Sequence, residues 1–312
     1  MARSCEGALV GAVEAGGTKV VCAVGTGPGE RMLARASFPT GDEPARLFAT
    51  AFGWLQEQER RHGRLQALGI ASFGPIDLDP SSPTYGWITS TPKPGWRNVD
   101  VVGEARKAFA TIPIGFDTDV GGAALGEHAW GHASGLSDFV YVTIGTGIGA
   151  GAMAGGRLVH GLVHPEMGHM LLPRVPGDFF PGICPFHGAC WEGLCAGPAL
   201  RARTGMRAED IPADHPAWVL EARYIAFAIA NVVCVLSPQR VILGGGVRKG
   251  GQLGEERFFR WIRDGVRAVL NGYLASPALD GGLDGFIVPP GLGDDAGICG
   301  ALALGQGAIV EK

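Results

Sequence analysis

Residues 8–24 have the sequence ALVGAVEAGGTKVVCAV, in which a glycine turn separates two apolar runs. β-branched residues are frequent in both runs, which predicts a strand on each side of the turn. Residues 139–159, FVYVTIGTGIGAGAMAGGRLV, repeat this scheme of strand, glycine turn and strand. The repetition predicts a duplicated fold of two similar α/β units rather than two unrelated domains.

The rest of the chain supplies elements for both units, and 312 residues are enough for one large or two medium domains. Apolar runs at 67–76, 112–117 and 240–247 predict buried strands. Helices are expected at 45–62, 100–109, 196–205, 217–236, 254–271 and 294–308. A long loop between the first two of these strands is rich in Pro and Ser, and loops of this length are usually functional.

Charge and cysteine content narrow the class of protein. The net charge is −4 and no cluster of Lys or Arg occurs, which argues against nucleic-acid and membrane partners. Seven cysteines, most of them single in apolar surroundings, fit free thiols in a reducing cytoplasm. The chain shows no signal-peptide layout and no apolar run long enough to span a membrane. These features predict a soluble cytoplasmic protein.

Residues 164–198 contain the most specific pattern. Cys184, His187 and Cys190 follow a C-x2-H-x2-C spacing, and His169 lies a short loop upstream. Two thiolates and two imidazoles suit tetrahedral Zn²⁺, and four protein ligands leave no position for a reacting water. We therefore expect a structural zinc. The alternative is packing of these side chains in a core, but the segment has no regular apolar period to fold it without a metal.

Two acidic residues adjoin these ligands. Glu166 lies three residues before His169, and Glu192 lies two residues after Cys190. A metal would fix both carboxylates near each other, as recognition of a polyhydroxylated ligand requires.

Three glycine turns are candidate phosphate or nucleotide sites, each with a simpler alternative. The first, Glu14–Lys19, could bind an anion through backbone N–H groups or could be only a tight hairpin. The second, Gly145–Ala150, matches a dinucleotide pattern, but a strand follows where that motif needs a helix. The third, Gly244–Gly246, could let a nucleotide lie on bare backbone or could be a packed turn.

Asp119 follows a predicted strand within Asp117-Thr118-Asp119. Carboxylates at strand ends are well placed for acid–base chemistry in α/β sheets, so Asp119 is a candidate general base. The alternative is a helix N-cap for the segment that follows.

Taken together, these motifs resemble the ROK family of sugar kinases, in the actin-like ATPase superfamily, over nearly the whole chain. EAGGTK, TIGTGIGAG and ILGGGV are similar to the family's two phosphate motifs and its adenosine motif. TPKPGW, DTDV and the zinc block are similar to its fructokinase branch. The resemblance implies two ribonuclease-H-like lobes with the active site in the cleft between them. These would be a smaller lobe at 1–116, joined by a C-terminal helix at about 297–312, and a larger lobe at 117–296 with a zinc-binding loop at 164–198.

The resemblance also implies the reaction and the residues that serve it. The γ-phosphate of ATP would pass to the 6-hydroxyl of D-fructose, with Mg²⁺ and a structural Zn²⁺, in a homodimer. Asp119 would be the catalytic base. The implied sugar-binding residues are Gly74, Thr118, Asp119, Glu166, His169 and Glu192. The implied ATP-binding residues are Gly16, Gly17, Thr18, Lys19, Gly145, Thr146, Gly147, Pro198, Gly244, Gly245, Gly246 and Val247.

The sequence departs from the family pattern at three positions, and it leaves other substrates and other functions open. Thr118 replaces a frequent Asn, Gly121 replaces a second Asn, and Glu14 replaces the more widespread Asp. Mannose, glucose or an amino sugar could be the acceptor, because loop details choose among hexoses. A sugar-responsive regulator of the family would need an N-terminal helix-turn-helix, for which the first hairpin leaves no room. An oxidoreductase reading of GTGIGA would require binding of NAD(H).

Overall fold

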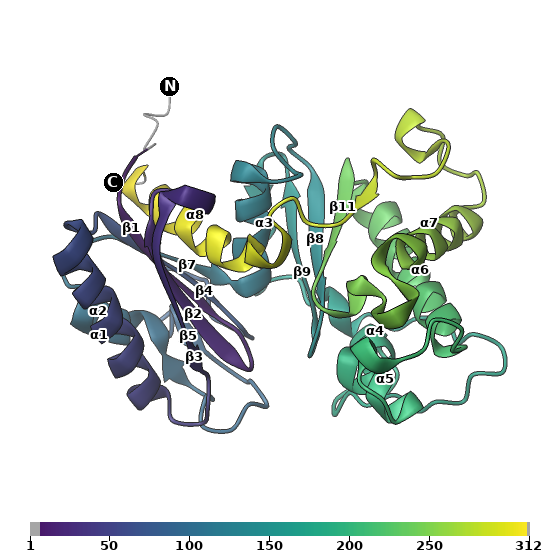
Figure 1. Cartoon of the computed structure of the whole chain (residues 1–312), viewed down its shortest axis with the longest axis horizontal. Helices are drawn as coiled ribbons and strands as arrows, with labels where there is room; N and C mark the ends of the chain where they lie inside the picture. Colours follow the sequence, from purple (N-terminus) through teal and green to yellow (C-terminus); the bar gives the residue numbers. More distant parts are fainter. Residues whose placement is uncertain (1–6, 311–312) are drawn as a thin grey trace. The chain divides into compact units, whose positions relative to one another are not determined.

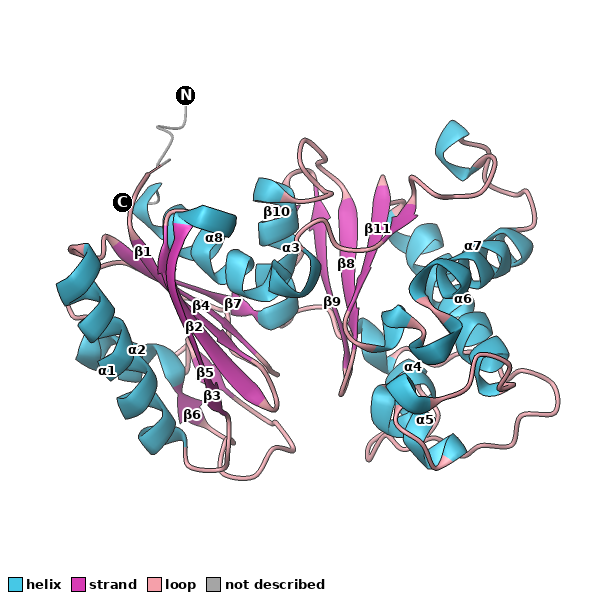
Figure 2. Ribbon diagram, viewed as in Figure 1, coloured by secondary structure: helices cyan, strands magenta, loops and turns pink. Residues whose placement is uncertain are grey.

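The computed structural model describes residues 7–310, which form two compact units. The first contains the described residues up to Ser134, the segment Leu158–His164, and those from Gly291 onward. The second contains Gly135–Arg157 and Pro165–Pro290. Each unit is built on a five-stranded sheet (Figure 2), which confirms the predicted α/β class. Cys5 lies outside the described residues.

The sheet of the first unit has the order β3-β2-β1-β4-β7. Its strands are β1 Val10–Ala15, β2 Lys19–Gly25, β3 Met32–Pro39, β4 Ala67–Ser72 and β7 Ile114–Thr118. The first hairpin pairs antiparallel as predicted, whereas β4 and β7 run parallel to β1. β4 and β7 therefore end at the same edge of the sheet as β1, and this edge carries the candidate residues of this unit.

Helices cover both faces of this sheet (Figure 1). One face carries α1 Pro44–His62 and α2 Val101–Ala108. Phe48 and Phe52 of α1 stack at 5.5 Å between ring centroids and bury against the sheet with Leu55. The other face carries α8 Ala296–Val310, the C-terminal helix, together with α3 Asp119–Trp130. The first unit extends past residue 116 to Ser134 because α3 packs against α8.

Glycines allow α8 to approach the sheet and α3 closely. A Cβ on Gly69 of β4 would lie 1.8 Å from the carbonyl oxygen of Ala301, and one on Gly300 would lie 1.9 Å from that of Gly122. Neither contact leaves room for a side chain, so part of the high glycine content is a packing requirement.

The sheet of the second unit has the order β10-β9-β8-β11-β12. Its strands are β8 Phe139–Ile144, β9 Ile148–Ala154, β10 Arg157–Leu158, β11 Arg240–Gly244 and β12 Ile287–Val288. The helices of this unit are α4 Trp191–Cys195, α5 Gly197–Thr204, α6 Ala217–Leu236 and α7 Glu255–Leu270. The second predicted hairpin is confirmed as β8 and β9.

Two features differ from the sequence prediction. The long loop contains a short antiparallel ribbon of β5 Trp87–Ile88 and β6 Val99–Asp100, where only irregular structure was expected. By length and composition, α6 could cross a membrane, but 56% of its apolar window is buried within the protein. It is therefore better explained as a core helix of the second unit.

Candidate functional site

The catalytic candidate Asp119 is the first residue of α3, directly after β7. Thr118 is the N-cap of that helix, because its Oγ1 accepts a hydrogen bond from the N–H of Gly121 at 2.9 Å. The capping role considered for Asp119 thus belongs to Thr118. The carboxylate of Asp119 accepts a hydrogen bond from the neighbouring N–H of Val120 at 2.9 Å, and the residue stays partly exposed. A carboxylate that stays partly exposed can take a proton from a ligand.

Electrostatics in the first unit favour a base that titrates near neutrality. Burial raises the pKa of Asp119 from 3.8 to about 6, and backbone N–H donors oppose this only partly. Burial, followed by the charge of Asp119, raises the pKa of Glu14 in β1 from 4.5 to about 7. Two neighbouring carboxylates with raised pKa values are typical of a functional site.

The first glycine turn forms the tip of the β1–β2 hairpin. The N–H of Gly16 donates to the carbonyl of Lys19 at 3.0 Å, and the side chains of Thr18 and Lys19 are exposed. A Cβ on Gly17 would meet nothing within 4 Å, so packing does not explain this glycine. The Lys93 ammonium donates to the carbonyl of Gly17 at 2.7 Å and adds a second positive charge beside the turn.

Sequence reasoning did not select Lys93. Its signal in the sequence was its position within TPKPGW. Lys93 lies 76 residues after Gly17, so the sequence did not indicate that the two residues meet.

The second glycine turn joins β8 and β9 and contacts one other predicted residue, Glu192, together with the start of α5. Glu192 of α4 accepts a hydrogen bond from the N–H of Ile148 at 2.9 Å, and its Oε2 lies 2.7 Å from where a Gly147 Cβ would be. The N–H of Gly197, next to Pro198, donates to the carbonyl of Gly145 at 2.7 Å. The structure therefore brings this turn, Glu192 and the start of α5 together within the second unit.

The third turn is partly explained by packing. A Cβ on Gly244 would lie 2.2 Å from the Tyr141 hydroxyl, and one on Gly245 would lie 2.3 Å from the carbonyl of Ile144. Gly246, by contrast, has nothing within 4 Å of the same position. Close packing thus requires the first two glycines, and only Gly246 leaves bare backbone exposed to a ligand.

The four predicted metal ligands come together in the second unit. One ligand atom from each of His169, Cys184, His187 and Cys190 lies within 4.8 Å of all the others. Three Sγ–Nδ1 distances are 3.6–3.7 Å. With zinc bonds of about 2.3 Å to sulfur and about 2.0 Å to nitrogen, a tetrahedron has sulfur–nitrogen edges of about 3.5 Å. The donor set and its spacing therefore fit a tetrahedral metal.

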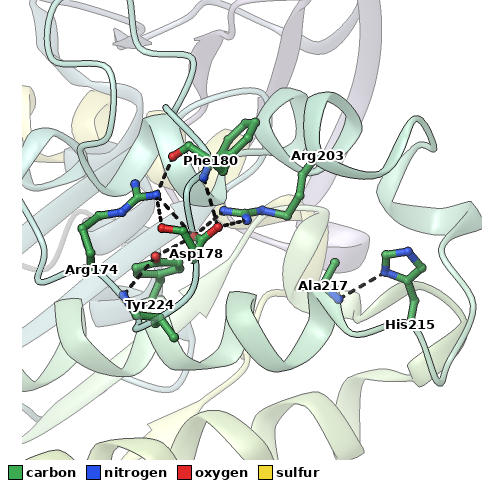
Figure 3. A network of polar contacts seen from close by, with 8 residues as sticks. Arg174, Asp178, Phe180, Arg203, His215, Ala217 and Tyr224 are labelled. Carbon is green, nitrogen blue, oxygen red and sulfur yellow. Dashed lines mark hydrogen bonds and ion pairs between the residues drawn. The ribbon is translucent and has the colours of Figure 1, made fainter.

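A polar network fixes the loop beside these ligands to two helices (Figure 3). The Asp178 carboxylate accepts from Arg203 of α5 at 2.6 Å and from the Tyr224 hydroxyl of α6 at 2.6 Å. Arg174, from the same loop as Asp178, donates to the carbonyl of Phe180 at 2.6 Å. Burial would raise the pKa of Asp178, but Arg203, Tyr224 and a backbone N–H lower it to about 2.

Asp178→Ala should lower the free energy of unfolding by about 3 kcal/mol, because it leaves the nearly buried Arg203 without its partner. Urea unfolding followed by circular dichroism would measure the change. Asp214→Ala, an exposed aspartate in the loop before α6, is the matched control. A loss below about 1 kcal/mol would show that the network contributes little.

Comparisons with known proteins agree with this arrangement. The model of the family described as "ROK family" matches residues 10–308. The fructokinase of Pediococcus pentosaceus is 44% identical over 96% of this chain and 99% of its own length, and that of Streptococcus mutans is 40% identical over 97% and 98%. The solved structure of a ROK hexokinase from Thermus thermophilus has a TM-score of 0.78 at 26% identity, covering 97% of this chain and all of that one.

Proposed function

Because the chain belongs to the ROK family, we propose that it is an ATP-dependent hexose kinase that phosphorylates the 6-hydroxyl of D-fructose. Near-full-length similarity to fructokinases at 40% identity or more supports the choice of fructose. The observation that carries the reaction is Asp119, a partly exposed carboxylate whose raised pKa suits a general base.

In the proposed reaction, the Asp119 carboxylate takes the proton of the sugar hydroxyl while that oxygen attacks the γ-phosphorus. The bond to the β-phosphate bridging oxygen breaks, and ADP leaves. Phosphoryl transfer depends mainly on positioning and charge neutralisation. The open glycine turns, with Lys19 and Lys93 beside the first, would hold the phosphates of Mg²⁺-ATP. Thr118, Glu166, His169 and Glu192, with Gly74, would orient the sugar hydroxyls.

The Cys/His cluster would hold Zn²⁺ as a structural metal. The metal would fix its ligand His169 directly, and it would fix Glu192 through the ligand Cys190 two residues earlier. These sugar-binding groups would then be in place before the sugar arrives. The proposed cellular location is the cytoplasm, which agrees with the free thiols of the described cysteines.

The proposal is tested by coupling ATP consumption to ADP detection with fructose, mannose, glucose and glucosamine. Strong preference for fructose would support the full proposal. Preference for another of these sugars would keep the kinase and overturn the choice of fructose. No turnover with any of them, in protein shown to contain zinc, would overturn the kinase function.

The pH dependence of kcat/KM should report the titration of Asp119. Its pKa is raised to about 6, so the base becomes protonated as the pH falls through that value. We expect kcat/KM for fructose to fall about tenfold per pH unit below about pH 6, because only the ionised form accepts the proton. A rate constant independent of pH between 5 and 7 would contradict the role of Asp119.

We also propose a homodimer that forms through a groove between α6 and α7. The groove has a volume of about 660 Å³ and is lined by apolar side chains together with Arg223 and Asp264, which have opposite charges. In the proposed dimer, a two-fold axis would bring Arg223 of one copy near Asp264 of the other, which also pairs with Arg267 of its own chain at 3.6 Å.

Val269→Glu, a partly exposed groove residue, should shift the mass measured by light scattering from dimer to monomer. Val235→Glu is the control, since Val235 is 80% exposed and lies outside the groove. A dimer that survives Val269→Glu would place the interface elsewhere.

A further inference from the structure

Residues 158–164 belong to the first unit, although the chain on both sides of them belongs to the second. Two histidines attach this segment to the end of β7 and to the loop that follows β4. His160 Nε2 lies 2.9 Å from Oδ2 of Asp117, the residue that precedes Thr118 at the end of β7. His164 Nε2 accepts a hydrogen bond from the N–H of Ile76 at 3.2 Å, just after Gly74 in the loop that follows β4.

The contact of His160 reaches the start of α3 through Asp117. The Asp117 side chain is only 6% exposed. While its Oδ2 faces His160, its Oδ1 accepts from the N–H of Thr118 at 2.7 Å and lies 3.3 Å from the Thr118 hydroxyl. That hydroxyl caps the helix that begins at Asp119. One carboxylate therefore links His160 to the residue that holds the catalytic candidate in place.

Gly121 provides the space that this arrangement needs. A Cβ at this position would lie 2.2 Å from Oδ1 of Asp117 and 2.8 Å from Oγ1 of Thr118. Gly121, which departs from the family pattern, therefore lies directly against the buried carboxylate of Asp117. A larger residue would push Asp117 away from the N–H of Thr118.

We propose that His160 is a positioning residue for phosphoryl transfer, which acts through Asp117 and Thr118 to set the direction of the Asp119 carboxylate. The inference rests on the kinase function proposed above. The His160 side chain is 42% exposed and contributes little to the core, so its hydrogen bond is its main contribution. The hydrogen bond to Asp117 raises the pKa of His160; burial opposes this, and the charge of Asp117 adds to it. The raised pKa favours the protonated imidazole, whose Nε2–H donates to Asp117.

The test compares His160→Leu with His160→Gln in the full-length enzyme. His160→Leu should lower kcat for fructose about tenfold, the effect of losing one hydrogen bond to a charged group, while KM for ATP and Tm stay unchanged. His160→Gln should recover most of kcat, because its amide nitrogen can donate to Asp117. His62→Leu, an exposed histidine at the end of α1, is the matched control.

A double-mutant cycle with Asp117→Asn shows whether the two residues act together. The losses of kcat in His160→Leu and Asp117→Asn should not multiply in the double variant. Multiplying losses, unchanged kcat in His160→Leu, or equal losses in both His160 variants with a lower Tm would overturn the proposal. Failure of the kinase function is distinct, because the unmodified enzyme would then turn over none of the sugars.

Discussion

Replacing Asp119 with Asn should lower kcat for sugar phosphorylation by about 10²–10⁴-fold, the usual contribution of a general base. The amide has nearly the shape of the carboxylate and can still accept the N–H of Val120, so α3 should begin as before. It cannot take up the hydroxyl proton. Steady-state kinetics with ATP in excess would measure the loss.

Binding of the sugar separates this result from a folding defect. Asp119→Asn should bind fructose with a Kd within a few fold of the unmodified protein in calorimetry, since Glu166, His169 and Glu192 are unchanged. Asp280→Asn, an exposed aspartate of the second unit, is the control for kcat. A near-normal kcat in Asp119→Asn would remove this residue from the mechanism.

Removing the metal ligand Cys184 should have the second large effect. In Cys184→Ser, three donors remain and the hydroxyl is a much weaker ligand than the thiolate. Because metal binding contributes to the folding free energy, Tm and fructokinase activity should fall together. Prolonged chelation of the unmodified protein should reproduce both losses, and added Zn²⁺ should restore them.

A matched cysteine exists in the same unit. Cys234 of α6 is exposed and takes no part in the Cys/His cluster, so Cys234→Ser should leave Tm, activity and zinc content unchanged. Zinc content by atomic emission would give the stoichiometry, expected to be one ion per chain. A Cys184→Ser variant that keeps its zinc and its Tm would show that the cluster is not a structural metal site.

Elements with strong local signals could be predicted from the sequence. The hairpin of β1 and β2, the amphipathic α1 and the apolar α6 lie where their patterns placed them. β3 was missed, although its residues alternate between partly buried and exposed, because Ala, Arg and Ser make that alternation weak. The close packing of Gly69 and Gly300 could not be predicted, because a glycine has the same appearance in a turn and beneath a helix.

In the candidate site, too, residues in local patterns could be predicted and residues with distant partners could not. The spacing of Cys184, His187 and Cys190 is local, so their grouping could be predicted, and the structure brings His169 to them. His160 and Lys93 could not be found, because each acts on a residue 43 or more positions away. A single histidine or lysine in a loop carries no pattern that indicates such a partner.

The position of α8 has a consequence for biosynthesis. One face of the first sheet, around Val10, Ala12 and Ala71, is covered by residues of the last helix of the chain. A chain growing from its N-terminus therefore exposes this apolar face until α8 has been synthesised, whereas the residues of the second unit are synthesised before α8. We therefore expect the first unit to complete its folding only after α8 has left the ribosome.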